Sequence, residues 1–184
     1  MNRKFAAVLA VAASAVVIAS AQSGDEATDK ARQAILDRQL SEDIPTDLAV
    51  GRSMFEANCQ RCHTFGAIGT QVGPDLTTLS SRFKENDVLE AILWPSKTIS
   101  DQYDSQIIET MDGYIINCII TRETANAVQV VTGELDRPFV IARDNIMSQR
   151  ASQVSIMPEG MADPMSPEEL ASLVAFVLGT PPEE

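Results

Sequence analysis

The chain has 184 residues, a length that suits one domain, or one domain with an insertion, better than two full domains. Its hydrophobic fraction of 45% and its charged fraction of 22% exclude wholesale disorder and a collagen-like chain. The formal net charge is −12, and because binding to phosphate backbones needs clustered Lys and Arg, we expect no nucleic-acid partner. The chain has three Cys and one His, so any site that needs histidine must use His63.

Residues 1–21 have the features of a secretory signal peptide. Two basic residues precede an almost wholly apolar stretch from Phe5 to Ile18, and Ala19-Ser20-Ala21 supplies the small-x-small pattern that a signal peptidase cleaves. The alternative is an uncleaved membrane anchor, but the apolar stretch is shorter than the ~20 residues that a spanning helix needs. We therefore expect cleavage after Ala21, a periplasmic or otherwise extracytoplasmic protein, and no strong membrane signal in the mature chain.

The mature chain is expected to begin with an irregular segment. Residues 22–30 are small and polar and predict a tether, and residues 31–40 have a weak amphipathic pattern that predicts a short accessory helix. Pro45 ends this region. Thr46 can then cap a helix that begins at Asp47 and runs to the segment Cys59–His63.

Two further helices are predicted from apolar spacing. Between Asn86 and Trp94 the apolar residues recur at helical intervals, and Pro95 stops the helix. Pro167 and two Glu open a last helix, which ends at Gly179.

The middle of the chain has the period of strands. Residues 106–111 and 114–121 flank Asp112-Gly113 and predict a β-hairpin, because glycine accepts the positive φ that a tight hairpin turn requires. Residues 128–131 and 139–142 predict two more strands. We therefore expect a β-rich insertion at about residues 102–145.

The chemistry of the chain is concentrated in Cys59-Gln60-Arg61-Cys62-His63, the pattern of covalent c-type haem attachment. Two thiols one helical turn apart can reach the two vinyl groups of a porphyrin, and the adjacent imidazole can then bind the iron. Three alternatives remain: a thioredoxin-like dithiol, a structural disulfide, and a zinc site that would use Cys118 as its fourth ligand. A thioredoxin-like dithiol is disfavoured because the sequence around the motif has no βαβ pattern. A zinc site is disfavoured because the adjacent residues Cys62 and His63 are difficult to place on one tetrahedral ion.

The chain resembles c-type cytochromes in a set of ordered motifs. These are Gly51-x-x-x-Phe55, the Cys-x-x-Cys-His motif, Gly73-Pro74-Asp75-Leu76, and a Met-Pro loop before the last helix. More narrowly, it resembles the haem-binding domain of planctomycete and verrucomicrobial proteins, which carries a β-rich insertion before its methionine ligand. The stretches that match are Val72–Thr77, Ile92–Ile99, the strands around Asp112-Gly113, and Ser155–Met161.

This resemblance implies a fold and a cofactor. The fold would be a mainly α, cytochrome c-like one over residues 46–180, with an inserted antiparallel β-hairpin or small sheet, and thus α+β overall. The cofactor would be one haem c, attached through thioethers to Cys59 and Cys62. The iron would be bound by His63 on the proximal side, with the carbonyl of Pro74 accepting the other N–H of the imidazole.

The distal ligand cannot be a second histidine, so a methionine thioether is the expected donor. Met157 matches the Ser-x-Met-Pro pattern of the family, and Pro158 holds it in an extended conformation. Met161 is the alternative. Either methionine could instead be a gap-filling core residue.

The remaining candidate residues have packing, haem-lining or propionate-binding roles. Gly51 and Phe55 should pack against the last helix near residues 174–176. Apolar side chains close to the ligand segments are expected to wall the haem, namely Leu76, Leu89, Leu93 and Ile156. Four side chains could bind the propionates or could equally be solvated surface residues: Arg82, Trp94, Lys97 and Tyr103. Cys118 stands where the family has a small residue, and it is expected to be a buried hydrophobe rather than half of an intermolecular disulfide.

The function that follows is one-electron transfer by an electron carrier, not an enzyme, between an oxidoreductase and an acceptor. The alternative is a haem-based sensor or a peroxidase-like protein whose methionine dissociates. Two basic residues and no acidic ones lie in the leader, so the mature chain would carry −14. This charge favours a redox partner with a basic docking patch, such as a dehydrogenase or a terminal acceptor.

Overall fold

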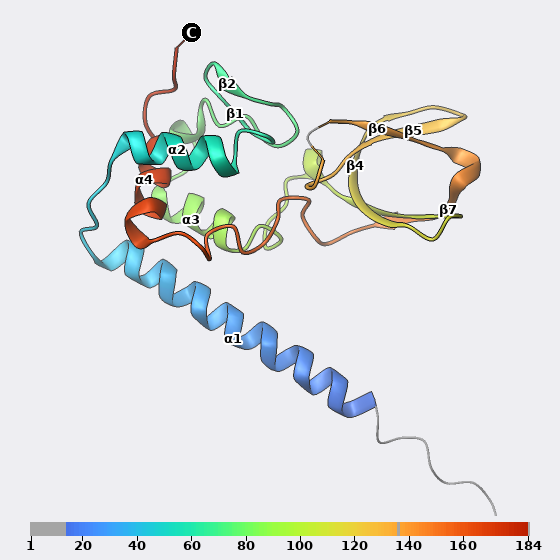
Figure 1. Ribbon diagram of the computed structural model, residues 1–184, viewed down its shortest axis with the longest axis horizontal. Coiled ribbons are helices and arrows are strands. Elements are labelled where there is room, and N and C mark those ends of the chain that lie inside the picture. Colours follow the sequence, from blue (N-terminus) through green and yellow to red (C-terminus); the bar gives the residue numbers. More distant parts are fainter. Residues whose placement is uncertain (1–13, 136, 184) are drawn as a thin grey trace, which may run out of the picture.

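The computed structural model describes residues 14–135 and 137–183, which form a group of helices beside a curled antiparallel sheet (Figure 1). The helices are α1 (Ser14–Ser41), α2 (Leu48–Asn58), α3 (Glu85–Leu93) and α4 (Pro167–Val177). The strands are β1 (Thr64–Phe65), β2 (Ile68–Gly69), β3 (Gln106–Thr110), β4 (Ile115–Glu123), β5 (Ala127–Val131), β6 (Phe139–Ala142) and β7 (Ile146–Ala151). Single 3-10 turns lie at Leu79–Ser81, Asp101–Tyr103 and Arg143–Asn145.

Local capping sets the ends of α2 and α4. The N-cap of α2 is Asp47, one residue later than we expected, because its carboxylate accepts from the backbone N–H groups of Ala49 at 2.8 Å and Val50 at 3.3 Å. At α4, Ser166 and Glu169 form a reciprocal capping box ahead of Pro167. The helices predicted around residues 86–94 and 167–179 are thus present, with bounds shifted by one or two residues.

The contact between α2 and α4 forms the centre of the helical core. A Cβ built on Gly51 would lie 2.1 Å from the Ser172 carbonyl oxygen and 2.7 Å from the Phe176 Cβ, so only glycine allows this approach. Below it, Phe55 and Phe176 pack with ring centroids 5.9 Å apart. Phe65 packs against both rings, at 5.9 Å and 5.2 Å. The predicted packing of Gly51 and Phe55 on the last helix is confirmed.

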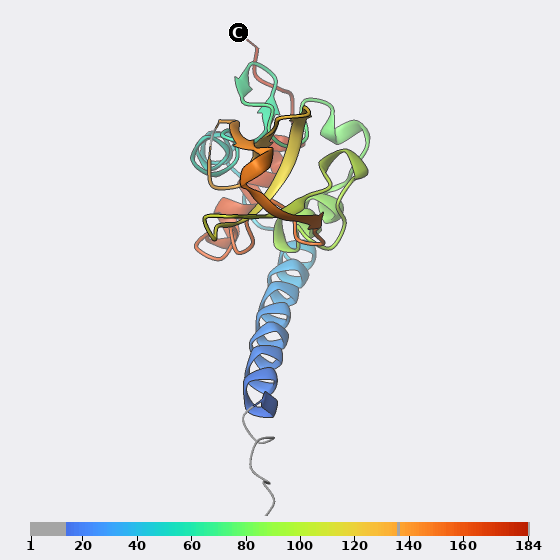
Figure 2. The same cartoon turned by 90° about the vertical axis from the view of Figure 1, so that its right-hand side faces the viewer.

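α1 is one continuous helix, where we had expected a tether followed by a short helix. Figure 2 shows it projecting from the rest of the molecule as a single rod, while its carboxyl-terminal half packs against α3 and α4. Leu36 is buried in the helical core, and Gln39 donates to the carbonyl of Pro167 at 2.8 Å. The predicted leader lies mostly outside the described residues, and its positions 14–21 belong to α1.

The sheet contradicts the expectation of a mainly α fold. Five antiparallel strands pair in the order β6-β5-β4-β3-β7, and β1 and β2 form a separate pair. The five strands enclose a core of their own, distinct from the helical one: Ile108, Cys118, Val128, Val130 and Ile141. Because this second core is self-contained, the fold is α+β with a substantial sheet, not a helical fold that carries a small hairpin.

β7 is the strand that the sequence analysis missed. It lies beyond the expected end of the insertion at residue 145 and pairs with β3 over residues 106–110. Five of its six side chains are exposed, from Met147 to Ala151, so it lacks the apolar alternation that marks a half-buried strand. An edge strand of this kind gains its order from backbone pairing, which the side-chain pattern does not reveal.

Within residues 14–135 and 137–183, no helix is both long enough and apolar enough to cross a membrane.

The close approach of α2 and α4 gives a prediction about Gly51→Ala. Alanine normally stabilises a helix interior relative to glycine by about 1 kcal/mol. Here the added methyl group would meet the Ser172 carbonyl, so we expect the variant to lose about 1–3 kcal/mol in urea unfolding. Ser53→Ala on the exposed face of the same helix is the control and should change stability by less than about 0.5 kcal/mol. A Gly51→Ala protein as stable as wild type would contradict the packing.

Candidate functional site

The Cys59–His63 segment is a tight turn at the carboxyl end of α2. Cys59 caps the helix through a 2.8 Å hydrogen bond from its N–H to the Phe55 carbonyl. Its own carbonyl then accepts from the N–H groups of Cys62 at 3.0 Å and His63 at 2.9 Å. The backbone therefore continues around one more turn, and both thiols and the imidazole are carried by that turn.

The imidazole of His63 is fixed by the loop that follows. Its Nδ1 lies 2.8 Å from the carbonyl oxygen of Pro74, which is the contact that the sequence resemblance implied. Because a carbonyl can only accept, Nδ1 carries the proton, and the lone pair of the neutral ring is on Nε2. The ring is thus in the tautomer that a metal ligand bound through Nε2 requires.

Gly73 makes room for that ring. A Cβ at Gly73 would lie 2.8 Å from Cε1 of His63 and 3.2 Å from its Nδ1. The N–H groups of Val72 and Gly73 donate to the Cys62 carbonyl at 3.0 Å and 2.7 Å, which holds the loop against the turn. Burial lowers the pKa of His63, and the hydrogen bond to Pro74 only partly offsets this, so the neutral ring is favoured.

The strand pair β1–β2 closes the other side of the turn. A Cβ at Gly69, which has a φ of 98°, would lie 2.0 Å from the His63 carbonyl oxygen. Leu76 donates from its N–H to the Thr64 carbonyl at 2.8 Å, so the Gly73–Leu76 segment runs alongside β1. The turn is therefore enclosed by backbone on both sides.

Both thiols of the turn are protonated at neutral pH. Burial raises the pKa of Cys59 to about 12, with a smaller contribution from Cys62, and burial also raises the pKa of Cys62. Neither is in a disulfide. The described residues contain no group of three or more His, Cys, Asp or Glu side chains that could hold a metal ion, so the Cys₃His zinc site does not assemble.

Cys118 lies elsewhere, fully buried in the core of the sheet. Burial raises the pKa of its thiol to about 11. Its environment is that of a small buried hydrophobe, as we expected.

The Met157 segment lies between the helical part and the sheet. Met157 is half-buried, and its N–H donates to Ser155 Oγ at 3.1 Å. The carbonyl of the preceding Ile156 abuts Gly133, whose own carbonyl accepts from Arg61 at 2.7 Å. Gly133 therefore contacts both the segment that carries Met157 and the turn that carries the cysteines.

The remaining predicted residues are in varied settings. Leu89 and Leu93 are buried in the helical core, and the partly buried Leu76 packs against this core. Met161 and Ile156 are half-buried.

Two of the proposed propionate ligands already have protein partners. The indole of Trp94 donates to Asp29 of α1 at 2.9 Å, and Lys97 pairs with Glu90. Arg82 lies over the ring of Phe83, with its guanidinium carbon 5.4 Å from the centroid, and Tyr103 is half-buried in a 3-10 turn.

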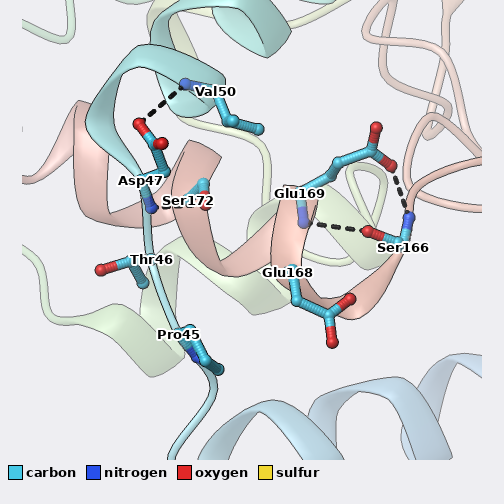
Figure 3. Close-up of a pocket in the computed structure, with 8 residues that line it drawn as sticks. All are labelled: Pro45, Thr46, Asp47, Val50, Ser166, Glu168, Glu169 and Ser172. Carbon is cyan, nitrogen blue, oxygen red and sulfur yellow. Dashed lines mark hydrogen bonds between the residues drawn. The ribbon is translucent and has the colours of Figure 1, made fainter.

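A pocket of about 480 Å³ lies at the amino ends of α2 and α4 (Figure 3). Figure 3 shows Asp47 and Ser166, two of its lining residues, engaged in capping these helices. Since the Cys59–His63 turn follows the opposite end of α2, this pocket is not part of the histidine site.

Three residues of the site were not singled out from the sequence: Arg61, Asn117 and Gly133. Asn117 is a polar residue between apolar neighbours on a strand, and Gly133 follows the apolar strand β5. These patterns are only weak sequence indications of a role in the site. The partners of Asn117 lie 37 and 38 positions away along the chain, and Ile156 lies 23 positions after Gly133. One sequence does not reveal such distant pairings.

No family model matches the chain, and no curated protein matches it.

The environment of His63 predicts a pH dependence of stability for the polypeptide produced without an attached cofactor. The folded-state pKa lies below the ordinary 6.5, so between these two values the unfolded chain binds more protons. The free energy of unfolding should therefore rise with pH through this window and fall as the pH drops below about 6.5. Because His63 is the only histidine, its Cε1–H resonance in an NMR titration needs no assignment.

The control for this prediction is His63→Gln, which lacks the titrating group. Its stability relative to wild type should improve as the pH falls through the window. A measured His63 pKa at or above 6.5 would contradict a neutral ring whose pKa is lowered by desolvation.

Proposed function

We propose that this chain is an exported monohaem c-type cytochrome that transfers single electrons. The observation that carries the proposal is the Cys59–His63 turn, a single backbone turn that carries two cysteines and an imidazole whose Nδ1 is bonded to the Pro74 carbonyl. Haem iron supplies the one-electron chemistry when bound. The protein's part is to attach the porphyrin, orient the iron ligands and limit access of water.

The donor set fits a covalent haem better than the other candidates. Cys59 and Cys62 are one helical turn apart, as two thioether bonds to one porphyrin require, and His63 is held with Nε2 as its lone-pair nitrogen. A structural zinc ion needs four ligands, and the described residues gather no group of three or more candidate side chains. The partly buried, protonated thiols also lack the low pKa that a redox-active dithiol uses.

Met157 is the distal ligand in this proposal. Its segment is connected to the Cys59–His63 turn through Gly133, and Pro158 restrains its backbone. The Met157 thioether and the His63 imidazole would together hold the iron, which would supply one-electron chemistry. Such a site favours electron transfer over binding of small ligands, and methionine raises the reduction potential.

The proposal is tested by expression with a cytochrome c maturation system. We expect a covalent haem by the pyridine haemochrome spectrum, its loss in the double variant Cys59→Ala/Cys62→Ala, and the long-wavelength ferric band of methionine-ligated iron. Met157→Ala should abolish that band and lower the reduction potential. Met161→Ala is the matched control and should retain both.

The outcomes separate the candidate functions. A reduced wild-type protein that binds CO readily would favour the sensor or peroxidase-like alternative. Wild-type protein without covalent haem would contradict the proposal. If the ferric methionine band were lost in Met161→Ala and retained in Met157→Ala, Met161 would be the distal ligand in place of Met157.

The redox partner in this proposal carries a basic docking patch, because the exported chain would have a net charge of −14. A long-range field of this sign attracts cations and is screened by salt. We expect electron transfer to a small cationic oxidant to slow several-fold between ~0.01 M and ~1 M salt, as the Debye length falls from ~30 Å to ~3 Å. Transfer to an anionic oxidant, the control, should instead become faster. Rates that do not change with salt for either oxidant would contradict electrostatic docking.

A further inference from the structure

The segment that carries Met157 is bonded to both parts of the molecule. On the helical side, Ser96 Oγ accepts from the Ser155 N–H at 3.2 Å, and Arg32 pairs with Glu159 at 3.0 Å. The carbonyls ahead of Met157 are bonded to the sheet side. The side-chain amide of Asn117, on β4, donates to the carbonyls of Val154 at 3.0 Å and Ser155 at 3.3 Å. The hydroxyl of Ser105, just before β3 and 1% exposed, also donates to the Val154 carbonyl. The carbonyls of Val154 and Ser155, three and two residues before Met157, are thus bonded to side chains on β4 and just before β3.

Gly133 holds the same segment by direct contact. A Cβ at this position would lie 1.9 Å from the Ile156 carbonyl oxygen, 3.1 Å from its carbon and 3.7 Å from Pro158 Cδ. The φ of Gly133 is not in the left-handed region, so glycine is required here for space and not for its backbone conformation.

The other side of Gly133 faces the cysteine turn. Its carbonyl accepts a 2.7 Å hydrogen bond from Nη2 of Arg61, the residue between Gln60 and Cys62. Gly133 therefore contacts the segment that carries Met157 and is hydrogen-bonded to the turn that carries His63.

We infer that Asn117 and Gly133 are positioning residues, through which the sheet holds the Met157 segment at a fixed place relative to the Cys59–His63 turn. One part of the inference, that this placement serves iron ligation, rests on the proposed function. A methionine side chain has three rotatable bonds, and its thioether is a weak ligand. Holding the backbone removes part of the entropy that binding would otherwise cost.

The test compares two sheet variants with two matched controls in the full exported protein. Gly133→Ala places a methyl group against the Ile156 carbonyl, and Asn117→Ala removes the amide that binds residues 154 and 155. Gly113→Ala is the control for the first, because it strains a glycine with a φ of 86° in the same sheet but has nothing within 4 Å. Asn145→Ala is the control for the second, because its amide bonds to Asp112, away from the segment.

Two measurements are made on each variant. Hydrogen exchange followed by mass spectrometry reports the protection of residues 154–160 whether or not a haem is attached. The second measurement is the pH at which the ferric methionine band is lost. We expect the sheet variants to exchange about tenfold faster in this segment, the effect of losing one or two hydrogen bonds, and to lose the band at a pH about one unit lower. The controls should match wild type in both.

Each outcome decides the inference. Unchanged exchange and an unchanged band in folded Asn117→Ala and Gly133→Ala proteins would overturn it. Faster exchange with an unchanged band would overturn the role in ligation. If the Gly133→Ala protein does not fold, the exchange and the band of the Asn117→Ala protein decide the inference. If wild type carries no haem, the proposed function and the ligation role both fall, and the exchange data alone decide whether the sheet holds the segment.

Discussion

The hydrogen bond between His63 and the Pro74 carbonyl joins the two loops on which the site depends. The bond fixes the tautomer of the ring and its orientation, and it needs the Pro74 carbonyl within 2.8 Å of Nδ1. The backbone meets that requirement through two donors from the same loop, Val72 and Gly73, to the Cys62 carbonyl. Gly73 also leaves space for the ring, since any larger residue would lie against Cε1. Three successive residues of one loop therefore serve the placement of a single imidazole.

Packing of α2 on α4 anchors this arrangement to the rest of the chain. Gly51 lets the two helices approach, and the three phenylalanine rings fill the space below them. Phe55 lies four residues before Cys59, and Phe65 lies two residues after His63. The aromatic cluster thus fixes the chain on both sides of the turn. The turn can be rigid because its flanking residues belong to the core, although its own side chains are only partly buried.

The parts of the fold that depend on local sequence were predictable. Helices α2, α3 and α4 follow from apolar spacing, capping residues and prolines, and the β3–β4 hairpin follows from Asp112-Gly113. The Cys59–His63 motif and its Pro74 partner followed from a short pattern and a resemblance. What failed depends on pairings between distant residues. β7 is ordered by its pairing with β3, and the predicted tether is helical and continuous with the half of α1 that packs against α3 and α4.

The mainly α expectation failed because strand counts alone do not show whether strands share a core. Alternate residues of β3, β4 and β5 meet in one buried cluster with Ile141 of β6, and the fully buried Cys118 is one of its members. A thiol there, with its pKa raised to about 11, is neither charged nor accessible, so its contribution is volume. With Cys118 committed to the sheet, only Cys59, Cys62 and His63 remain for chemistry, and all three lie on one turn of the helical part. The cysteines are therefore divided between the two parts of the molecule: Cys59 and Cys62 lie at the end of α2 with His63, and Cys118 fills space in the core of the sheet.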